Sequence, residues 1–86
     1  MTRAEVFALL EEERQHQDKK WGSVTDHPHD VGGWLTLIRV YLTRAEAAWA
    51  TSRGDAGALA EVRKLAALAV ACLEQHSDAE LLKPTQ

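Results

Sequence analysis

The stretch from residue 31 to residue 49, VGGWLTLIRVYLTRAEAAW, is the longest run of periodic apolar residues in the chain. Counting from Trp34, apolar residues recur at Ile38, Tyr41 and Ala45, and this helical spacing predicts an α-helix. A second stripe beside the first contains Leu35, Leu42 and Trp49. Because the apolar face is wide, we expect this helix to contact neighbours on more than one side and to supply most of the core.

The composition favours an all-α fold, since 45% of the 86 residues are hydrophobic and only two are prolines. A chain of this length buries only about 60 to 65 per cent of its unfolded surface, so its stability alone is expected to be marginal. We therefore predict a single domain over residues 1–86. It should be a small bundle of three main helices and a short C-terminal turn, completed by oligomerisation.

Thr2 and Glu5 have the spacing of a capping box, which predicts the start of a first helix. The inward face of this helix begins with the apolar residues Val6, Leu9 and Leu10. One and two turns further along the same face come Glu13 and Gln17, so the inward side changes from apolar to polar. This half of the helix is expected either to extend beyond the core into solvent or to line a polar cavity.

Gly54 is placed to end the second helix. A third helix is predicted to follow it, with Asp55 as its N-cap and its end near His76. Its expected inward residues are Leu59, Val62, Leu65 or Ala66, Ala69, Cys72 and Leu73. The second and third helices should then form an antiparallel hairpin. A capping-box pattern and a proline predict one short last turn within residues 77–84.

Residues 18–33, DKKWGSVTDHPHDVGG, contain three glycines and a proline and show no lasting periodicity, so they are predicted to form a long loop. Long loops in small domains often carry function, and Trp21 is the expected anchor of this one on the bundle. Asp26, His27, His29 and Asp30 place two carboxylates and two imidazoles within five residues, and these are ligand types for zinc, nickel or manganese. The alternative is that these side chains hydrogen-bond the backbone of the loop.

The charge balance and hydropathy argue against several classes of protein. A net charge of -3 and a pI near 5.7 lack the basic excess that nucleic-acid binding requires, so no nucleic-acid partner is expected. No run approaches the roughly 20 apolar residues of a membrane-spanning helix, and the first residues show neither signal nor transit character. We therefore expect a cytoplasmic protein. The single cysteine, Cys72, is expected to be a small buried hydrophobic residue.

Several short motifs occur in a fixed order along the chain. Residues 13–22 read ERQHQDKKWG, a histidine-containing loop follows, Trp34-Leu35-Thr36 opens the second helix, and Ala66-Ala67-Leu68-Ala69 lies in the third. In this order and spacing the chain resembles the small phage and bacterial MazG-like members of the all-α nucleotide pyrophosphohydrolases. The resemblance extends over nearly the whole chain.

In that family the second helix carries Glu-Glu-x-x-Glu and the third carries Glu-x-x-Asp, and these carboxylates hold magnesium against a nucleoside triphosphate. Alignment on the motif that opens the second helix places its three glutamate positions on Val40, Tyr41 and Arg44. Alignment on the alanine motif places the third-helix positions on Glu61 and Lys64, of which only Glu61 matches. No cofactor is therefore expected. Cross-helix ion pairs of Arg44 and Lys64 with Glu61, and with Glu46, are expected to replace the charge of the metal.

The resemblance leaves three functions open. The first is a catalytically degenerate MazG-like protein that acts as an interaction module, as a homodimer or tetramer formed through its second and third helices, with a possible protein partner. The second is a nucleotide-binding module whose ligand-binding residues are Gln17, Trp21, Arg44, Glu61 and Lys64. The third is an active pyrophosphohydrolase that uses magnesium on a rebuilt site drawn from Glu12, Glu13, Asp26, His27, Glu46 and Glu61.

Overall fold

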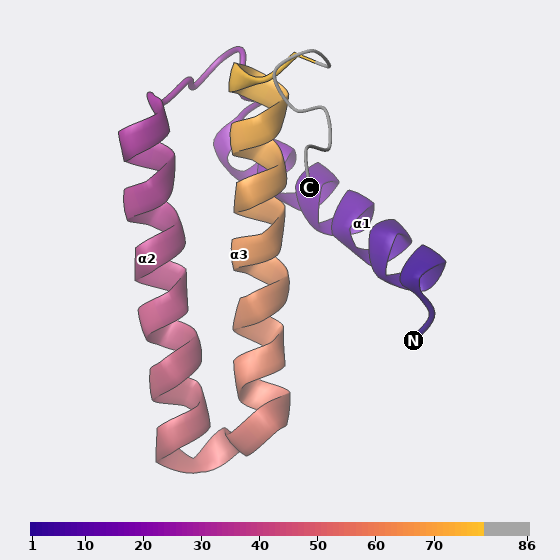
Figure 1. Ribbon diagram of the computed structural model, residues 1–86, viewed down its shortest axis with the longest axis vertical. Helices are drawn as coiled ribbons and strands as arrows, with labels where there is room; N and C mark the ends of the chain where they lie inside the picture. Colours follow the sequence, from indigo (N-terminus) through magenta and orange to yellow (C-terminus); the bar gives the residue numbers. More distant parts are fainter. Residues whose placement is uncertain (79–86) are drawn as a thin grey trace, which may run out of the picture.

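The computed structural model describes residues 1–78, with the side chains of residues 52 and 53 left aside. It contains three helices, α1 (Arg3–Trp21), α2 (Val31–Ala48) and α3 (Gly54–His76), and a π-helical turn η1 (Trp49–Arg53). The helices α2 and α3 form the expected antiparallel hairpin, and α1 crosses α3 obliquely so that its first half extends away from the hairpin (Figure 1). The all-α prediction is confirmed over these residues, and most of the predicted last turn lies outside them.

The start of α1 agrees with the sequence, but its end does not. Thr2 accepts a hydrogen bond from the Glu5 backbone at 3.2 Å and donates its own backbone N–H to the Glu5 carboxylate at 2.8 Å, which lowers the pKa of Glu5. The predicted loop start at Asp18 is wrong, because α1 continues to Trp21 and stops only at Gly22, where φ is 88°. Asp18 forms an ion pair with Arg14, one turn earlier on the same helix, and such a pair favours the helical conformation of residues 14–18.

The loop is also shorter at its other end, since the two glycines expected in it belong to the first turn of α2. The Asp30 carboxylate caps this helix and accepts the Gly33 N–H at 2.6 Å. A Cβ atom at position 33 would lie 3.0 Å from the Asp30 carboxylate and 3.3 Å from the His29 side chain. Glycine therefore leaves room for the cap, and the connecting loop is only residues 22–30.

The connection between α2 and α3 is a widened last turn. Gly54, with φ at 57°, follows η1 and opens α3, which confirms a break at this residue and an end of the third helix at His76. Asp55 was expected as an N-cap but lies inside the first turn of α3. Its carboxylate instead accepts the indole N–H of Trp49 at 3.1 Å, which ties the two ends of the hairpin turn together.

The core is small and lies mainly where the first part of α2 packs against the last part of α3, at the top of Figure 1. The buried hydrophobic residues of the described chain are Trp34, Tyr41, Ala45, Ala67, Leu68 and Ala71. Half-buried Val24, Leu37, Ile38, Leu65 and Cys72 pack against them. The second helix therefore supplies half of the buried hydrophobic residues rather than most of the core, and Cys72 is partly rather than fully buried.

The prediction of which side of α3 faces inward is wrong in part. Leu59, Val62 and Leu73 were expected inside, but their exposed fractions are 63%, 42% and 50%. They lie on the side of the helix opposite Leu68. Both sides of α3 are apolar, and the one with Ala67 and Ala71 is buried because small side chains allow neighbouring helices to approach closely.

Gln75 fastens the loop to the C-terminal end of α3. Its side-chain oxygen accepts the His29 backbone N–H at 3.2 Å and the Trp34 indole N–H at 2.9 Å, and its amide donates to the His29 carbonyl at 2.6 Å. The His29 ring meets the Trp34 ring edge-on, with centroids 4.8 Å apart. One glutamine side chain therefore holds both the loop and a core tryptophan.

Across the described helices, none is long and apolar enough to cross a membrane.

Replacing Gln75 with Met should lower the free energy of unfolding by about 1–2 kcal/mol, because the indole of Trp34 and the His29 backbone lose their partner. Urea denaturation followed by tryptophan fluorescence measures this change. The matched control is Gln15→Met on the exposed side of α1, where the amide donates to Glu11 at 3.3 Å and the change should stay within about 0.5 kcal/mol. Equal losses in the two variants would contradict the assigned role of Gln75.

Candidate functional site

The interface between α1 and α3 is polar. Glu13, Arg14 and Gln17 are the buried polar residues of the described chain, with exposed fractions of 7%, 6% and 3%. They continue the face of α1 that begins with Val6 and Leu10. The polar half of this face is therefore not a solvated helix end, because it packs against α3. Of the two alternatives, the polar cavity is closer to what is found, since Glu13 lines an open pocket of about 270 Å³ and Arg14 and Gln17 line a cavity of about 30 Å³.

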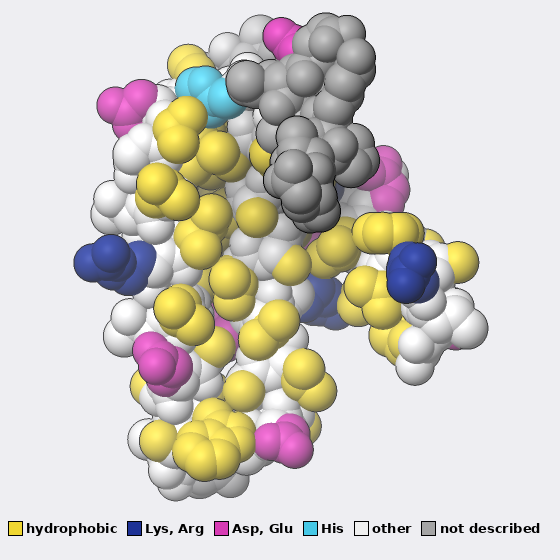
Figure 2. All heavy atoms as spheres, viewed as in Figure 1, with side chains coloured by type: hydrophobic (Ala, Val, Ile, Leu, Met, Phe, Trp, Pro, Cys, Tyr) yellow, Lys and Arg dark blue, Asp and Glu magenta, His cyan; other side chains and the backbone are white. Residues whose placement is uncertain are grey.

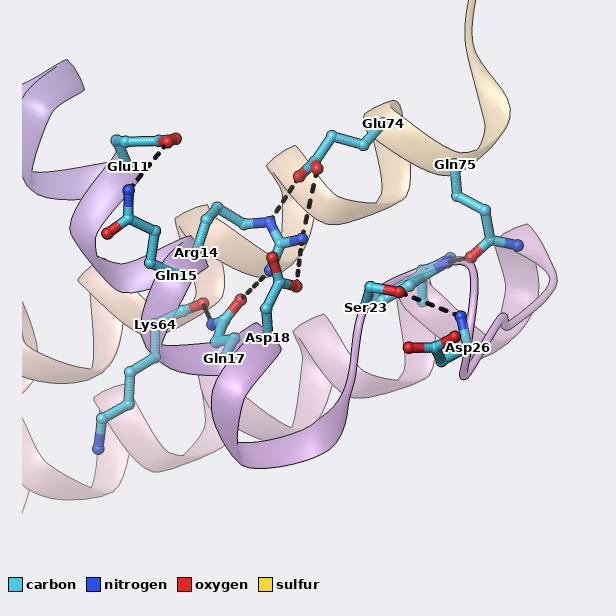
Figure 3. A network of polar contacts seen from close by, with 11 residues as sticks. Glu11, Arg14, Gln15, Gln17, Asp18, Ser23, Asp26, Lys64, Glu74 and Gln75 are labelled. Carbon is cyan, nitrogen blue, oxygen red and sulfur yellow. Dashed lines mark hydrogen bonds and ion pairs between the residues drawn. The ribbon is translucent and has the colours of Figure 1, made fainter.

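Arg14 is the centre of this interface (Figure 3). Its guanidinium donates to the Glu74 carboxylate at 2.5 Å, to Asp18 at 2.9 Å and to the side-chain oxygen of Gln17 at 3.3 Å. Burial alone would lower the pKa of Arg14, but the hydrogen bonds to Glu74 and Asp18 outweigh it and raise this pKa above its ordinary value. Arg14 therefore stays charged and joins the start of the chain to the end of α3.

Gln17, predicted as a ligand-binding residue, has both ends of its amide engaged inside the protein. The oxygen accepts from Arg14, and the nitrogen donates to the Lys64 backbone carbonyl at 3.2 Å (Figure 3). Glu13 forms a further ion pair with Arg63 at 3.0 Å. These contacts make Gln17 and Glu13 positioning residues for α1.

The cross-helix ion pairs expected around Glu61 are not found in the described part of the chain. Glu61 pairs with Lys64 at 3.4 Å, but both residues lie on α3. The Arg44 guanidinium instead stacks over the Tyr41 ring on α2, 4.6 Å from its centroid. Glu46 is exposed and takes part in none of the ion pairs among residues 1–78. The reason is geometric, since stacking on Tyr41 keeps Arg44 on its own helix.

The second oxygen of the Glu61 carboxylate is occluded from solvent and is the one such side-chain atom, among the described residues, that has no hydrogen-bond partner. Glu61 and Lys64 line an open groove of about 680 Å³ near the hairpin turn. Its other lining residues are small or short, namely Ala48, Thr51, Ala56, Gly57 and Ala60. The groove therefore offers one incompletely satisfied carboxylate above a floor of small side chains.

The candidate metal ligands of the loop do not converge. The His27 ring lies against Gly22, where an added Cβ would come within 2.3 Å of it, and His29 is held by Gln75 and Trp34. Asp26 donates its backbone N–H to the Ser23 hydroxyl at 3.2 Å. In residues 1–78, no three His, Cys, Asp or Glu side chains gather closely enough to hold a metal ion.

A mainly apolar pocket of about 340 Å³ opens between the loop and the upper half of the hairpin. It is lined by Trp21, His27, His29, Trp34, Leu37, Tyr41 and Leu68. A cavity of about 30 Å³, the volume of roughly one water molecule, lies beside it and is lined in part by Trp21, Arg14 and Gln17. Trp21 therefore packs against the bundle as expected, although 42% of its surface is exposed.

The structure distributes the five predicted ligand-binding residues over several places. Trp21 lines the aromatic pocket and Gln17 the small cavity beside it, whereas Glu61 and Lys64 line the groove. Arg44 contacts Tyr41, which itself lines the pocket. Sequence reasoning missed Glu74 and Gln75, because nothing in the local pattern indicates contacts with partners 60 and 46 residues away.

Arg14→Met should destabilise the protein by about 2 kcal/mol, because the interface between α1 and α3 loses its bidentate cation while Glu74 and Asp18 are exposed enough to be rehydrated. Arg14→Lys should lose less, since it keeps the charge without the planar fork. The control Arg39→Met removes an exposed arginine of α2. Thermal and urea unfolding measure all three, and a loss in Arg39→Met equal to that in Arg14→Met would refute the assignment.

Comparison with known proteins adds no relative: no family model, no curated protein and no solved structure matches this chain.

Proposed function

We propose that this chain is a self-associating helical interaction module that completes its bundle with further copies of itself. The observation that carries the proposal is an apolar surface that runs along both helices of the hairpin. We define this seam by its residues: Val31, Leu35, Ile38, Leu42, Ala45 and Trp49 along α2 and η1, and Leu59, Val62, Ala66, Ala69 and Leu73 on α3. Ala45 continues the stripe but is already buried within one copy. Along both helices the steps alternate between three and four residues, the spacing of coiled-coil contacts.

Most of the large seam residues are exposed in a single copy. The exposed fractions are 58% for Leu35, 47% for Leu42, 62% for Trp49 and 63% for Leu59. Hydrophobic side chains cover much of the hairpin face that Figure 2 shows. By contrast, three of the six buried hydrophobic residues of the described chain are alanines, so one copy leaves more large apolar side chains outside than inside.

Pairing two hairpins through the seam would bury these side chains in a four-helix bundle. Stable protein interfaces bury about 1,200–2,000 Å² in total, and two helices of this length can supply such an area. The seam is also nearly free of charge, as the cores of such interfaces are. A second copy fits better than an unrelated partner, because identical heptad-like surfaces are self-complementary about a two-fold axis.

The resemblance to MazG-like proteins supports the same proposal. Under this proposal, the chain keeps the helical frame of a nucleotide pyrophosphohydrolase but not its acidic lining. Of the five positions at which that family has carboxylates, this chain has Val40, Tyr41, Arg44, Glu61 and Lys64. A single carboxylate is too few oxygen ligands for a magnesium cluster, which favours binding over catalysis.

Leu42→Glu should reduce the molar mass of the assembly at least twofold, because it places a charge in the middle of the seam. Size-exclusion chromatography with light scattering measures the mass. Val40→Glu is the matched control, since Val40 is exposed to a similar extent but lies on the other side of α2. A wild-type monomer, or the same mass for Leu42→Glu as for wild type, would refute the proposal.

The aromatic pocket favours a second function, nucleotide binding. A planar base could stack among Trp21, Trp34 and Tyr41, beside the imidazole of His27. The pocket is close to Arg44 through its contact with Tyr41, so a cation is at hand for phosphate. Gln17 would act only indirectly, because its amide is already bonded within the protein.

A panel of nucleotides tested by thermal shift and calorimetry, with and without Mg²⁺, separates the candidates. Under nucleotide binding, the melting temperature rises without metal and the effect is lost in Trp21→Ala but kept in Trp49→Ala, an exposed tryptophan outside the pocket. A rise that depends on Mg²⁺, with release of pyrophosphate, would instead establish a rebuilt enzyme. An unchanged melting temperature throughout the panel would count against both and leave self-association as the function.

A further inference from the structure

The first half of α1 is an arm that the other described residues cover only in small part. Arg3, Phe7, Leu10 and Arg14 share one face of the helix, and this face is buried against α3 only at its Arg14 end. Phe7 is 63% exposed, and Val6 beside it is 37% exposed. Figure 1 shows the reason, since α1 crosses α3 and its first half extends beyond the hairpin. We call residues 3–10 the arm.

The groove lined by Glu61 and Lys64 is the complementary feature. It lies on the side of α3 opposite Leu59 and Val62, so it is separate from the seam. Its floor of Ala56, Gly57 and Ala60 would allow the backbone of another helix to come close. The groove is therefore an unfilled surface that seam pairing would leave open.

The carboxylate of Glu61 in the groove favours a helix that carries a positive charge. The Glu61 side chain is still 20% exposed where it lines the groove, and its ion pair with Lys64 on the same helix is long, at 3.4 Å. The arm carries Arg3 at its free end, and Arg3 takes part in no ion pair among the described residues. A guanidinium and the positive end of a helix are both favourable next to a carboxylate.

We propose that the arm of each copy lies in the groove of a second copy, with Phe7 and Leu10 over the small residues and Arg3 toward Glu61. In its own chain the arm leads away from the groove. Contacts of Gln17 with Lys64 and of Glu13 with Arg63 fix α1 beside the end of the groove, and from there the helix runs outward (Figure 1). Because arm and groove adjoin the same crossing point, two copies related by a two-fold axis can exchange arms reciprocally.

This inference rests on the proposed self-association and makes it more specific. Seam and groove lie on opposite sides of α3, so seam pairing and arm exchange join a copy to two different neighbours. The combined result is a tetramer with two kinds of two-fold interface. Either interface alone would give only a dimer.

Molar mass in solution tests the two interfaces separately. Wild type should be a tetramer, Leu42→Glu a dimer held by its arms, Phe7→Glu a dimer held by its seam, and the double variant a monomer. If Leu42→Glu is instead a monomer and Phe7→Glu keeps the mass of wild type, arm exchange is wrong while the seam stands. If all variants match wild type, or wild type is a monomer, both proposals are overturned.

Cross-linking places the arm directly. In a Cys72→Ala background, one chain carries Phe7→Cys and a second chain with a mass tag carries Ala60→Cys; the two are mixed, allowed to exchange and oxidised. We expect a covalent heterodimer as the main product, and at least fivefold less of it when Ala8→Cys, on another side of α1, replaces Phe7→Cys. Equal yields from the two arm positions, or no heterodimer, would overturn the proposal.

Charge reversal gives an independent reading of the contact between Arg3 and Glu61. Arg3→Glu should weaken the arm interface about tenfold, because two symmetric contacts are lost in each pair of copies. The double variant Arg3→Glu with Glu61→Lys should recover affinity to within about threefold of wild type, since the opposite charges are restored. If the second substitution weakens the assembly further instead, the pairing is wrong.

Discussion

The close packing of the helices at Ala67, Leu68 and Ala71 determines which side of α3 faces inward. These side chains are almost fully buried, and two of them are small enough to let neighbouring helices approach closely. Because this side of α3 faces inward, the side that carries Leu59 and Val62 must face outward. The choice of one helix face therefore accounts at once for the small core and for the apolar seam.

The attachment of α1 depends on directional polar contacts rather than on apolar area. Arg14 must meet Glu74 and Asp18 together, and Gln17 must reach the Lys64 carbonyl, so only one crossing position of α1 satisfies them. An apolar contact of the same size would tolerate sliding, whereas buried polar groups penalise any position that leaves them unpaired. The fixed crossing is what leaves the first half of α1 outside the hairpin.

Local signals in the sequence were sufficient for the fold class and for several helix ends. The capping box of Thr2 and Glu5, the break at Gly54 and the period of α2 depend on neighbours within one or two turns. The side of α3 that faces inward could not be predicted, because both of its sides have helical apolar spacing. The contacts of the candidate site could not be predicted either, because the partners of Arg14 and Trp34 lie on α3, far along the chain.

Two of the positions that the sequence alignment places on carboxylates of the MazG-like family hold side chains that contact each other. Tyr41 is 8% exposed and its ring supports the Arg44 guanidinium, so both side chains serve packing where the resembling family has carboxylates. Glu61 keeps a carboxylate, but its neighbours are an ammonium group and small apolar residues. In the proposed arm exchange, a guanidinium from another copy pairs with the exposed part of this carboxylate through one contact. A metal ion at the same place would require several further oxygen ligands.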